Sequence, residues 1–398
     1  TLFEETHPKY VEPLNPITFV PGKNDQFIWQ SRRDGYNHLY LYNTNGRMIR
    51  QLTQGEWEVT DLVGFDSEGQ HLFFTSTRPT PLERHLYRMK LSSGKMHKLT
   101  SQPGYHSCQL QPEGSWVIDR FSSRNNPRTI QVLDEKGRPL QTLLESDDPL
   151  SKYKLGEMNI STLTAGDGQT QLYYRLIKPT DFDPDKKYPA IIYVYGGPHA
   201  QLIQNRWLGA TRLWQYYMAQ KGYVMLTIDN RGSAARGMAF ENVIHRQLGK
   251  HEIADQIQGV ELLKDLDYVD QNRIGIHGWS YGGFMTTSLM LKKPGVFQVG
   301  VAGGPVIDWK YYEVMYGERY MDAPQDNQKG YRQANLKNYV NNLQGDLLLI
   351  QGYMDDVVVP QHSMSFIREC VKENVQIDYF IYPRHTHNVR GRDRVHLM

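Results

Sequence analysis

Short segments in which apolar and polar residues alternate fill the first part of the chain, and they come in repeated sets. Equivalent serines, Ser31, Ser76 and Ser122, recur at a spacing of about 45 residues. This is the period of one four-stranded propeller blade, so the pattern predicts about three blades within residues 1–150. Three sandwich hairpins at accidental spacing are the alternative interpretation. The segments are residues 27–31, 38–42 and 49–53, then 72–76, 85–89 and 97–100, then 117–122, 129–133 and 140–144.

Three blades do not close a propeller. Roughly four are the minimum, because each blade buries its faces against its neighbours. We therefore expect further blades upstream of Thr1, which would make residues 1–398 a fragment of a longer protein.

The pattern changes after a loop rich in proline and aspartate at residues 179–189. Short, continuously apolar segments then alternate with stretches of helical spacing, such as residues 253–266. Such strands are typical of a mainly parallel sheet with helices on both faces. We therefore predict a doubly wound α/β domain at residues 151–398, after the partial propeller at 1–150. Its predicted strands are residues 190–195, 224–229, 273–278, 296–304, 346–352 and 376–382.

The composition is that of an ordinary globular protein and excludes some classes of function. The formal net charge is only +2 and no run of lysine or arginine occurs, which disfavours a nucleic-acid-binding surface. No apolar run is long enough to cross a bilayer. Cys108 and Cys370 lie too far apart in sequence to form a disulfide framework or a metal-ligand motif, and we expect neither a metal nor a cofactor.

The sequence Gly278-Trp279-Ser280-Tyr281-Gly282 carries the clearest candidate chemistry. It follows a predicted strand and precedes a stretch that suits a helix, which is the setting of a nucleophilic serine in an α/β-hydrolase. Such a serine needs an imidazole as its base and a carboxylate to orient that imidazole.

Two later loops supply both groups in the chain order Ser, Asp, His that α/β-hydrolases use. The strand predicted at residues 346–352 leads to Asp355 and Asp356, and the last predicted strand leads to His385 and His387. Order and context therefore favour a catalytic triad, but spacing does not choose within either pair.

The tetrahedral intermediate of acyl transfer also needs hydrogen-bond donors for its oxyanion. The backbone N–H of Tyr281, directly after the nucleophile, is one candidate. The phenol of Tyr195, at the end of a predicted strand and before two glycines, is the second. A half-buried core tyrosine is the alternative interpretation of Tyr195.

With the serine motif, "VYGGP" at residues 194–198 and "DNRGS" at 229–233, the chain resembles the prolyl oligopeptidase clan of serine peptidases, specifically its dipeptidyl peptidase IV branch. Within that branch it is most similar to the bacterial prolyl tripeptidyl aminopeptidases. The resemblance favours Asp355 and His387 as the partners of Ser280. It also implies an α/β-hydrolase domain with an eight-bladed propeller, and one more helix than this chain contains after its histidine loop.

The resemblance carries further expectations about partners and location. It implies peptide substrates with proline near the N-terminus, no cofactor, and a place outside the cytoplasm, in the periplasm or cell envelope. Members of the branch often form homodimers through the terminal helix and propeller extensions, and we expect neither element in this chain.

Residues 306–320 contain aromatic side chains at helical spacing. On one helix, Trp309, Tyr312 and Tyr316 would form a single stripe with Glu313 beside Tyr312. Such a stripe is more often core, but tyrosine hydroxyls that need partners suit a pocket wall.

The resemblance implies that Trp309, Tyr312 and Tyr316 line the slot for the proline before the cleaved bond, with Val306 and Val357 near it. Dipeptidyl enzymes of the branch carry an asparagine at the position of Val357, where it holds a substrate carbonyl. Glu313 matches a glutamate that helps to hold the substrate ammonium in the tripeptidyl enzyme. Both features favour release of Xaa-Xaa-Pro tripeptides over Xaa-Pro dipeptides.

Two other functions remain open from the sequence. A general esterase or acylaminoacyl hydrolase would use the same scaffold but prefer simple esters over proline peptides. A catalytically silent binding protein would use the propeller as a recognition surface and would not react with a fluorophosphonate. We also expect residues 1–398 alone to be a poor peptidase, because upstream blades would wall the active-site chamber.

Overall fold

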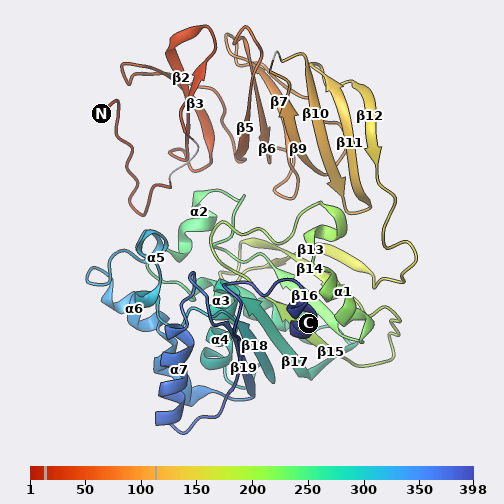
Figure 1. The fold of residues 1–398 in the computed structure, drawn as a ribbon, viewed down its shortest axis with the longest axis vertical. Coiled ribbons are helices and arrows are strands. Elements are labelled where there is room, and N and C mark those ends of the chain that lie inside the picture. The colour runs from red at the N-terminus through yellow and green to blue at the C-terminus, as the bar shows by residue number, and fades with distance from the viewer. Residues whose placement is uncertain (13–15, 113) are drawn as a thin grey trace. The chain divides into compact units, whose positions relative to one another are not determined.

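The structure is a computed structural model that describes residues 1–12, 16–112 and 114–398 (Figure 1). It contains two compact units. The first consists of Thr1–Tyr153 with Ile203–Thr211 and Ala234–Glu241, and the second of Lys154–Leu202, Arg212–Ser233 and Asn242–Met398. Among the described residues, no helix has both the length and the apolar character that a membrane span requires.

The first unit contains three four-stranded antiparallel sheets, each with its strands in chain order (Figure 1). This confirms the prediction of about three propeller blades. The strands of the first sheet are β1 Thr18–Val20, β2 Lys23–Ser31, β3 His38–Asn43 and β4 Met48–Gln51; of the second, β5 Val59–Phe65, β6 His71–Ser76, β7 His85–Lys90 and β8 Met96–Lys98; of the third, β9 Tyr105–Leu110, β10 Trp116–Ser123, β11 Asn126–Asp134 and β12 Pro139–Glu145.

The repeated sequence of the blades has a structural cause. In the first blade His38 donates or accepts a hydrogen bond through Nδ1 with Thr53 Oγ1, at 3.0 Å. His85 and Thr100 repeat that contact in the second blade at 2.9 Å. Each threonine hydroxyl also accepts a backbone N–H, so it links two neighbouring strand ends of its blade. The periodic "HLY" and "LT" sequences are therefore one buried polar contact used twice.

The second unit is built on one eight-stranded sheet in the order β13-β14-β16-β15-β17-β18-β19-β20. The pairs β13–β14 and β14–β16 are antiparallel, and every later pair is parallel. This confirms the predicted mainly parallel α/β sheet. Its strands are β13 Met158–Thr164, β14 Gln171–Ile177, β15 Tyr188–Tyr193, β16 Val224–Ile228, β17 Val269–Trp279, β18 Val299–Gly303, β19 Asp346–Gly352 and β20 Asp378–Tyr382.

Helices occupy the connections between these strands (Figure 1). Helix α3, for example, buries Ile253, Val260 and Leu263, which recur at the spacing of one helical face. The helices of the second unit are α1 Leu213–Gln220, α3 His251–Lys264, α4 Tyr281–Lys292, α5 Val314–Met321, α6 Gln328–Ala334, α7 Gln361–Lys372 and α8 Asp393–Leu397, and α2 Met238–Glu241 belongs to the first unit.

The strand order contains a reversal point at β15, in the middle of the sheet. Strands β16 and β17 lie on opposite sides of β15, so the chain reverses its direction of travel across the sheet at β15. In open α/β sheets the carboxyl ends of strands at such a reversal form the ligand crevice. Tyr195 follows β15 and Ser280 follows β17, so both emerge at this position.

Candidate active site

Ser280 lies at a sharp turn between β17 and α4. Its backbone has φ 64° and ψ −120°, in a region that a non-glycine residue occupies at a cost. Its N–H donates to Gly303 O at 2.8 Å, which fixes the turn against β18. A side chain at Gly282 would come within 2.3 Å of Val194 O, so this position requires glycine. The serine motif therefore forms the tight strand-to-helix turn that presents a nucleophile.

The Ser280 hydroxyl does not form a hydrogen bond to the helix that follows it. Although Ser280 is the residue that precedes α4, its side chain makes no capping bond to the helix. A serine in this position normally caps the first turn. Without a capping bond, the hydroxyl remains available to give its proton to a base and to attack an electrophile.

Asp355 and His387 form a hydrogen-bonded pair. His387 Nδ1 lies 2.8 Å from Asp355 Oδ2. Asp355 is only 3% exposed, and its other carboxylate oxygen accepts the N–H groups of Val357 and Val358 at 3.0 and 2.9 Å. The buried, fully bonded carboxylate orients the imidazole so that Nε2 is the nitrogen left for proton transfer.

The neighbouring candidates lie elsewhere. Asp356 is exposed. His385 Nε2 contacts Asp393 Oδ2 at 2.8 Å, in an exposed pair after β20. Of the two aspartates and two histidines that spacing left open, the structure therefore brings Asp355 and His387 together.

Two contacts hold the His387 loop close to the serine turn. Trp279, directly before Ser280, donates from Nε1 to His387 O at 2.7 Å. The second contact is close packing of the His387 ring on Gly304, where an added Cβ atom would come within 3.2 Å of His387 Cε1. The residue before it, Gly303, accepts the Ser280 N–H, so the ring and the serine turn meet at the same segment. Ser280 Oγ and His387 Nε2 do not form a hydrogen bond here, which is common in sites without substrate because such contacts tighten on binding.

Both predicted oxyanion donors lie beside the serine turn. The Tyr281 N–H is the first of α4, and the first N–H groups of a helix have no acceptor within the helix. The ring of Tyr195 packs 6.1 Å from that of Tyr281, centroid to centroid. Burial and the neighbouring Tyr193 raise the pKa of Tyr195, so its phenol remains a donor at neutral pH.

The side chain of Tyr281 is held by a carboxylate that the sequence did not single out. Tyr281 donates its hydroxyl proton to Glu252 Oε1 at 2.6 Å, and the Gly249 N–H donates to the same oxygen at 3.0 Å. Glu252 is fully buried in the first turn of α3, and its Oε2 has no partner among the described residues. Burial raises the pKa of Glu252 to about 7.

This environment predicts an unusual pH dependence of stability. The folded-state pKa of Glu252 exceeds its unfolded value of 4.5. The contribution of Glu252 to the unfolding free energy is therefore fully present below pH 4.5 and is lost as the pH rises through about 7. Glu252→Gln keeps the Oε1 acceptor but does not titrate. We expect the wild type, but not the variant, to lose about 2–3 kcal/mol of unfolding free energy from this group between pH 5 and pH 8. Urea unfolding at both pH values measures this, and equal pH dependence in the two proteins would contradict it.

The segment with the aromatic pattern is not one helix, so that prediction was wrong. Trp309–Tyr311 form a short 3-10 helix, Tyr312 and Glu313 are extended, and α5 begins at Val314. Asp308 caps the start of the 3-10 helix, because its side chain accepts the Lys310 N–H, and it also contacts Asn335 and Lys337. The break comes after this helix, at the extended backbones of Tyr312 and Glu313, so Tyr316 lies on a second helix.

The three aromatic side chains gather nonetheless. The ring of Trp309 lies 5.4 Å from that of Tyr312 and stacks on that of Tyr316 at 6.0 Å and 10°. The nearby Tyr195 contributes to raising the pKa of both tyrosines, although burial is the larger cause. The cluster therefore adjoins the candidate oxyanion tyrosine.

The remaining predicted binding residues differ in exposure. Val306 is buried, whereas Val357 is 42% exposed and Glu313 is exposed at the start of α5. The backbone next to Val306 is fixed by His362, whose Nδ1 accepts the Ile307 N–H at 3.0 Å. Burial lowers the pKa of His362 to about 4, so the ring is neutral and keeps this acceptor at physiological pH.

Besides Glu252 and His362, the sequence reasoning missed Gln351, whose Nε2 donates to Asp355 Oδ2 at 3.1 Å. These residues act through neighbours that only the fold brings close, and no sequence motif marks them. Within the second unit, the described residues contain no group of three metal-ligating side chains with convergent ligand atoms.

Two family models match the chain. Residues 210–398 match the prolyl oligopeptidase family, and residues 1–128 match the dipeptidyl peptidase IV N-terminal region. Among curated proteins, human dipeptidyl peptidase 8 is 34% identical over 358 residues, which cover 85% of this chain and 40% of that protein. The chain thus spans less than half of this relative.

Solved structures agree with these matches. A putative dipeptidyl aminopeptidase IV from Bacteroides ovatus superposes with a TM-score of 0.93 at 48% identity, over 98% of this chain and 58% of its own. Dipeptidyl peptidase 4 from Porphyromonas gingivalis gives a TM-score of 0.89 at 34% identity, over 95% of this chain and 54% of its own. The chain belongs to the prolyl oligopeptidase family, in its dipeptidyl peptidase IV branch.

Proposed function

We propose that this chain carries the active site of a serine exopeptidase that cleaves peptides after proline near their N-terminus. The observation that carries the proposal is the 2.8 Å contact between His387 Nδ1 and the buried Asp355, close to the Ser280 turn. The similarity to dipeptidyl peptidases supports the same class of reaction.

In the proposed mechanism Ser280 Oγ attacks the carbonyl carbon of the scissile bond while His387 Nε2 accepts its proton. The Tyr281 N–H and the Tyr195 hydroxyl donate to the oxyanion that forms. His387 then gives the proton to the leaving amine, and the acyl group stays on Ser280. Water, deprotonated by His387, releases the N-terminal fragment and restores the serine.

The aromatic cluster suits the residue before the cleaved bond. A proline ring is rigid and apolar, so it gains from contact with the faces of Trp309, Tyr312 and Tyr316. These rings adjoin Tyr195, and a proline in contact with them would bring its carbonyl to the proposed oxyanion donors.

We further propose that the products are Xaa-Xaa-Pro tripeptides. Val357 offers no side-chain hydrogen bond to a substrate carbonyl, although it is exposed beside Asp355. Glu313 is an exposed carboxylate at the edge of the aromatic cluster, where it would pair with a substrate ammonium. This site would admit one residue more than a dipeptidyl site.

Glu313→Gln is expected to raise KM for substrates with a free N-terminal amine by roughly tenfold, because a charge-assisted hydrogen bond contributes about 1.5–3 kcal/mol. N-blocked substrates should change little. Steady-state kinetics with matched free and acetylated peptides measure the difference.

Glu318→Gln is the matched control. It removes the same charge from an exposed position inside α5, whereas Glu313 directly precedes that helix. If Glu313→Gln weakens free and blocked substrates equally, or if dipeptides dominate the products, the tripeptidyl proposal fails while the serine peptidase proposal stands.

The general proposal is tested with two measurements on the same protein. A fluorophosphonate probe should label Ser280, as mass spectrometry of the digested chain would show. A peptide library digested by the protein should give products that end in proline, in preference to hydrolysis of simple esters. Absence of labelling would favour a silent binding protein, and ester preference a general hydrolase.

A further inference from the structure

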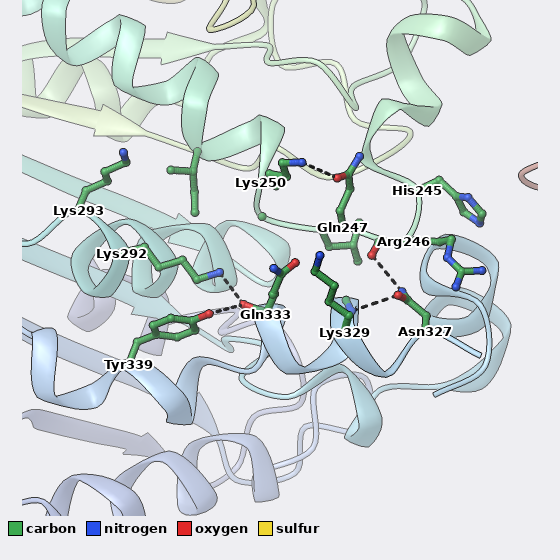
Figure 2. Close-up of a pocket in the computed structure, with 14 residues that line it drawn as sticks. His245, Arg246, Gln247, Lys250, Lys292, Lys293, Asn327, Lys329, Gln333 and Tyr339 are labelled. Carbon is green, nitrogen blue, oxygen red and sulfur yellow. Dashed lines mark hydrogen bonds between the residues drawn. The ribbon is translucent and has the colours of Figure 1, made fainter. Parts of the chain in front are cut away.

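A cavity of about 720 Å³ lies in the second unit, and none of the residues that line it belongs to the candidate active site (Figure 2). The connection before α3, the end of α4, helix α6 and the 3-10 helix Leu336–Asn342 all contribute to its lining. Figure 2 shows lysine side chains from three of these segments around the same space.

The lining of this cavity is strongly cationic. Among its residues are five lysines and arginines and one histidine, with no aspartate or glutamate. The whole chain has 45 basic and 43 acidic residues, so this excess is local. The cations are Arg246, Lys250, Lys292, Lys293 and Lys329.

Most of this charge is not neutralised. Arg246 pairs with Asp322, which lies outside the lining. Lys250 Nζ donates to Gln247 Oε1 at 3.0 Å and Lys292 Nζ to Gln333 O at 2.9 Å, and both of these acceptors are neutral. Over the described residues, none of the four lysines forms an ion pair. Four lysines therefore line one space whose lining contains no carboxylate, and the buried Glu252, outside that lining, acts on Lys292.

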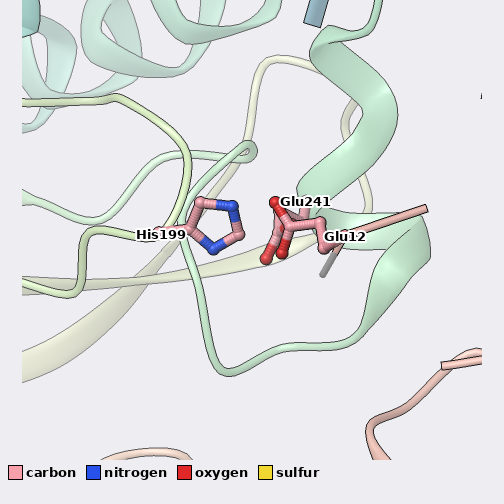
Figure 3. Close-up of side chains that lie close together, drawn as sticks. All are labelled: Glu12, His199 and Glu241. Atoms are coloured by element: carbon pink, nitrogen blue, oxygen red, sulfur yellow. The ribbon is translucent and has the colours of Figure 1, made fainter. Parts of the chain in front are cut away.

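A cluster of like charges in the first unit offers a contrast, because a group of opposite charge lies beside it. There the carboxylates of Glu12 and Glu241 (Figure 3) lie within 4.8 Å of each other. Arg32 lies 3.7 Å from Glu12, 2.9 Å from Glu241 and 3.7 Å from Glu58, so each of these carboxylates has a basic group within ion-pair distance. The lysine cavity has no such internal counter-charge.

Two features favour an anion over a water-filled gap. Lys292 is partly buried, and burial lowers its pKa to about 8 while the Glu252 carboxylate acts in the opposite direction. A desolvated ammonium gains more from an anion than an exposed one does. The N-terminus of the 14-residue helix α3 also borders the cavity, at Gly249, Lys250 and Ile253. Its N-cap residue Lys250 makes no side-chain capping bond, and Glu252 accepts the N–H of Gly249, before the helix. The other N–H groups of this first turn add partial positive charge.

We propose that this cavity binds a small anion with two or more phosphate groups. Lysines from three segments surround a volume large enough for several phosphates, whereas a single phosphate would reach only some of them. Both a free polyphosphate and the phosphate chain of a nucleotide have this chemistry. The site is separate from the proposed peptidase reaction, so either proposal can fail without the other.

Isothermal titration of the protein with inorganic tripolyphosphate, ATP and orthophosphate tests the proposal. We expect tripolyphosphate and ATP to bind with one-to-one stoichiometry and orthophosphate to bind at least tenfold more weakly. Equal affinity for tripolyphosphate and ATP would identify the phosphates as the recognised part, and tighter binding of ATP would identify a nucleotide. Both results support the site.

Variants then locate the binding. Lys329→Gln and Lys293→Gln change exposed side chains and should each weaken tripolyphosphate roughly tenfold. Lys372→Gln, at the exposed end of α7, removes the same charge elsewhere and should change affinity less than twofold. No binding of either ligand, or equal weakening by Lys372→Gln, overturns the proposal.

Discussion

Alanine at Ser280, His387 or Asp355 should lower kcat by roughly 10⁴- to 10⁶-fold, and the three losses should not add. The reason is that the groups act in one step. Without Ser280 there is no nucleophile, and without His387 its proton has no acceptor. Without Asp355 the imidazole loses the 2.8 Å contact that orients it. A triple variant should therefore be little worse than Ser280→Ala. Steady-state kinetics on a peptide with proline as its third residue measure these effects.

The chain provides its own controls for this prediction. Asp356 is adjacent to Asp355 in sequence but is exposed. His385 contacts Asp393 and not Asp355. Asp356→Ala and His385→Ala should retain at least a third of the wild-type rate. A dead His385→Ala with an active His387→Ala would show that the other histidine is the base.

The sequence could predict the sheets because their strands are regular. The bounds predicted for strand β19 are the bounds that it has, since its short central run of leucine and isoleucine allows few alternatives. The first strand of each blade was missed. Strand β5, for instance, contains Asp61 and Gly64, and its register shifts twice against β6, so the period-two pattern is lost.

The candidate site shows the same division between local and tertiary information. The serine turn is local, and its glycines mark it in the sequence. The choice between Asp355 and Asp356 is not local, because it depends on which carboxylate the turn after β19 buries against Val357 and Val358. The single helix expected at residues 306–320 failed because Tyr312 and Glu313 are extended, and nothing in the spacing of the aromatic residues marks that interruption.

Tyr195→Phe is the second change for which we expect a large effect. Its phenol is proposed to donate to the oxyanion, and one such donor contributes about 3–4 kcal/mol, so kcat should fall roughly 10²- to 10³-fold. KM should change little, because the ground-state carbonyl gains less from the donor than the oxyanion does. The ring packs beside Tyr281 in either protein, and the variant should therefore fold normally.

Tyr193→Phe separates this role from the loss of a buried hydroxyl. Tyr193 is the last residue of β15, shortly before Tyr195, but its ring packs against Trp214 and His277 rather than against Tyr281. Removing its hydroxyl should leave kcat within about threefold of the wild type. If Tyr195→Phe also stays within that range, the Tyr281 N–H alone serves the oxyanion and Tyr195 is a core residue. If Tyr195→Phe instead raises KM and leaves kcat unchanged, its phenol binds the substrate and not the transition state.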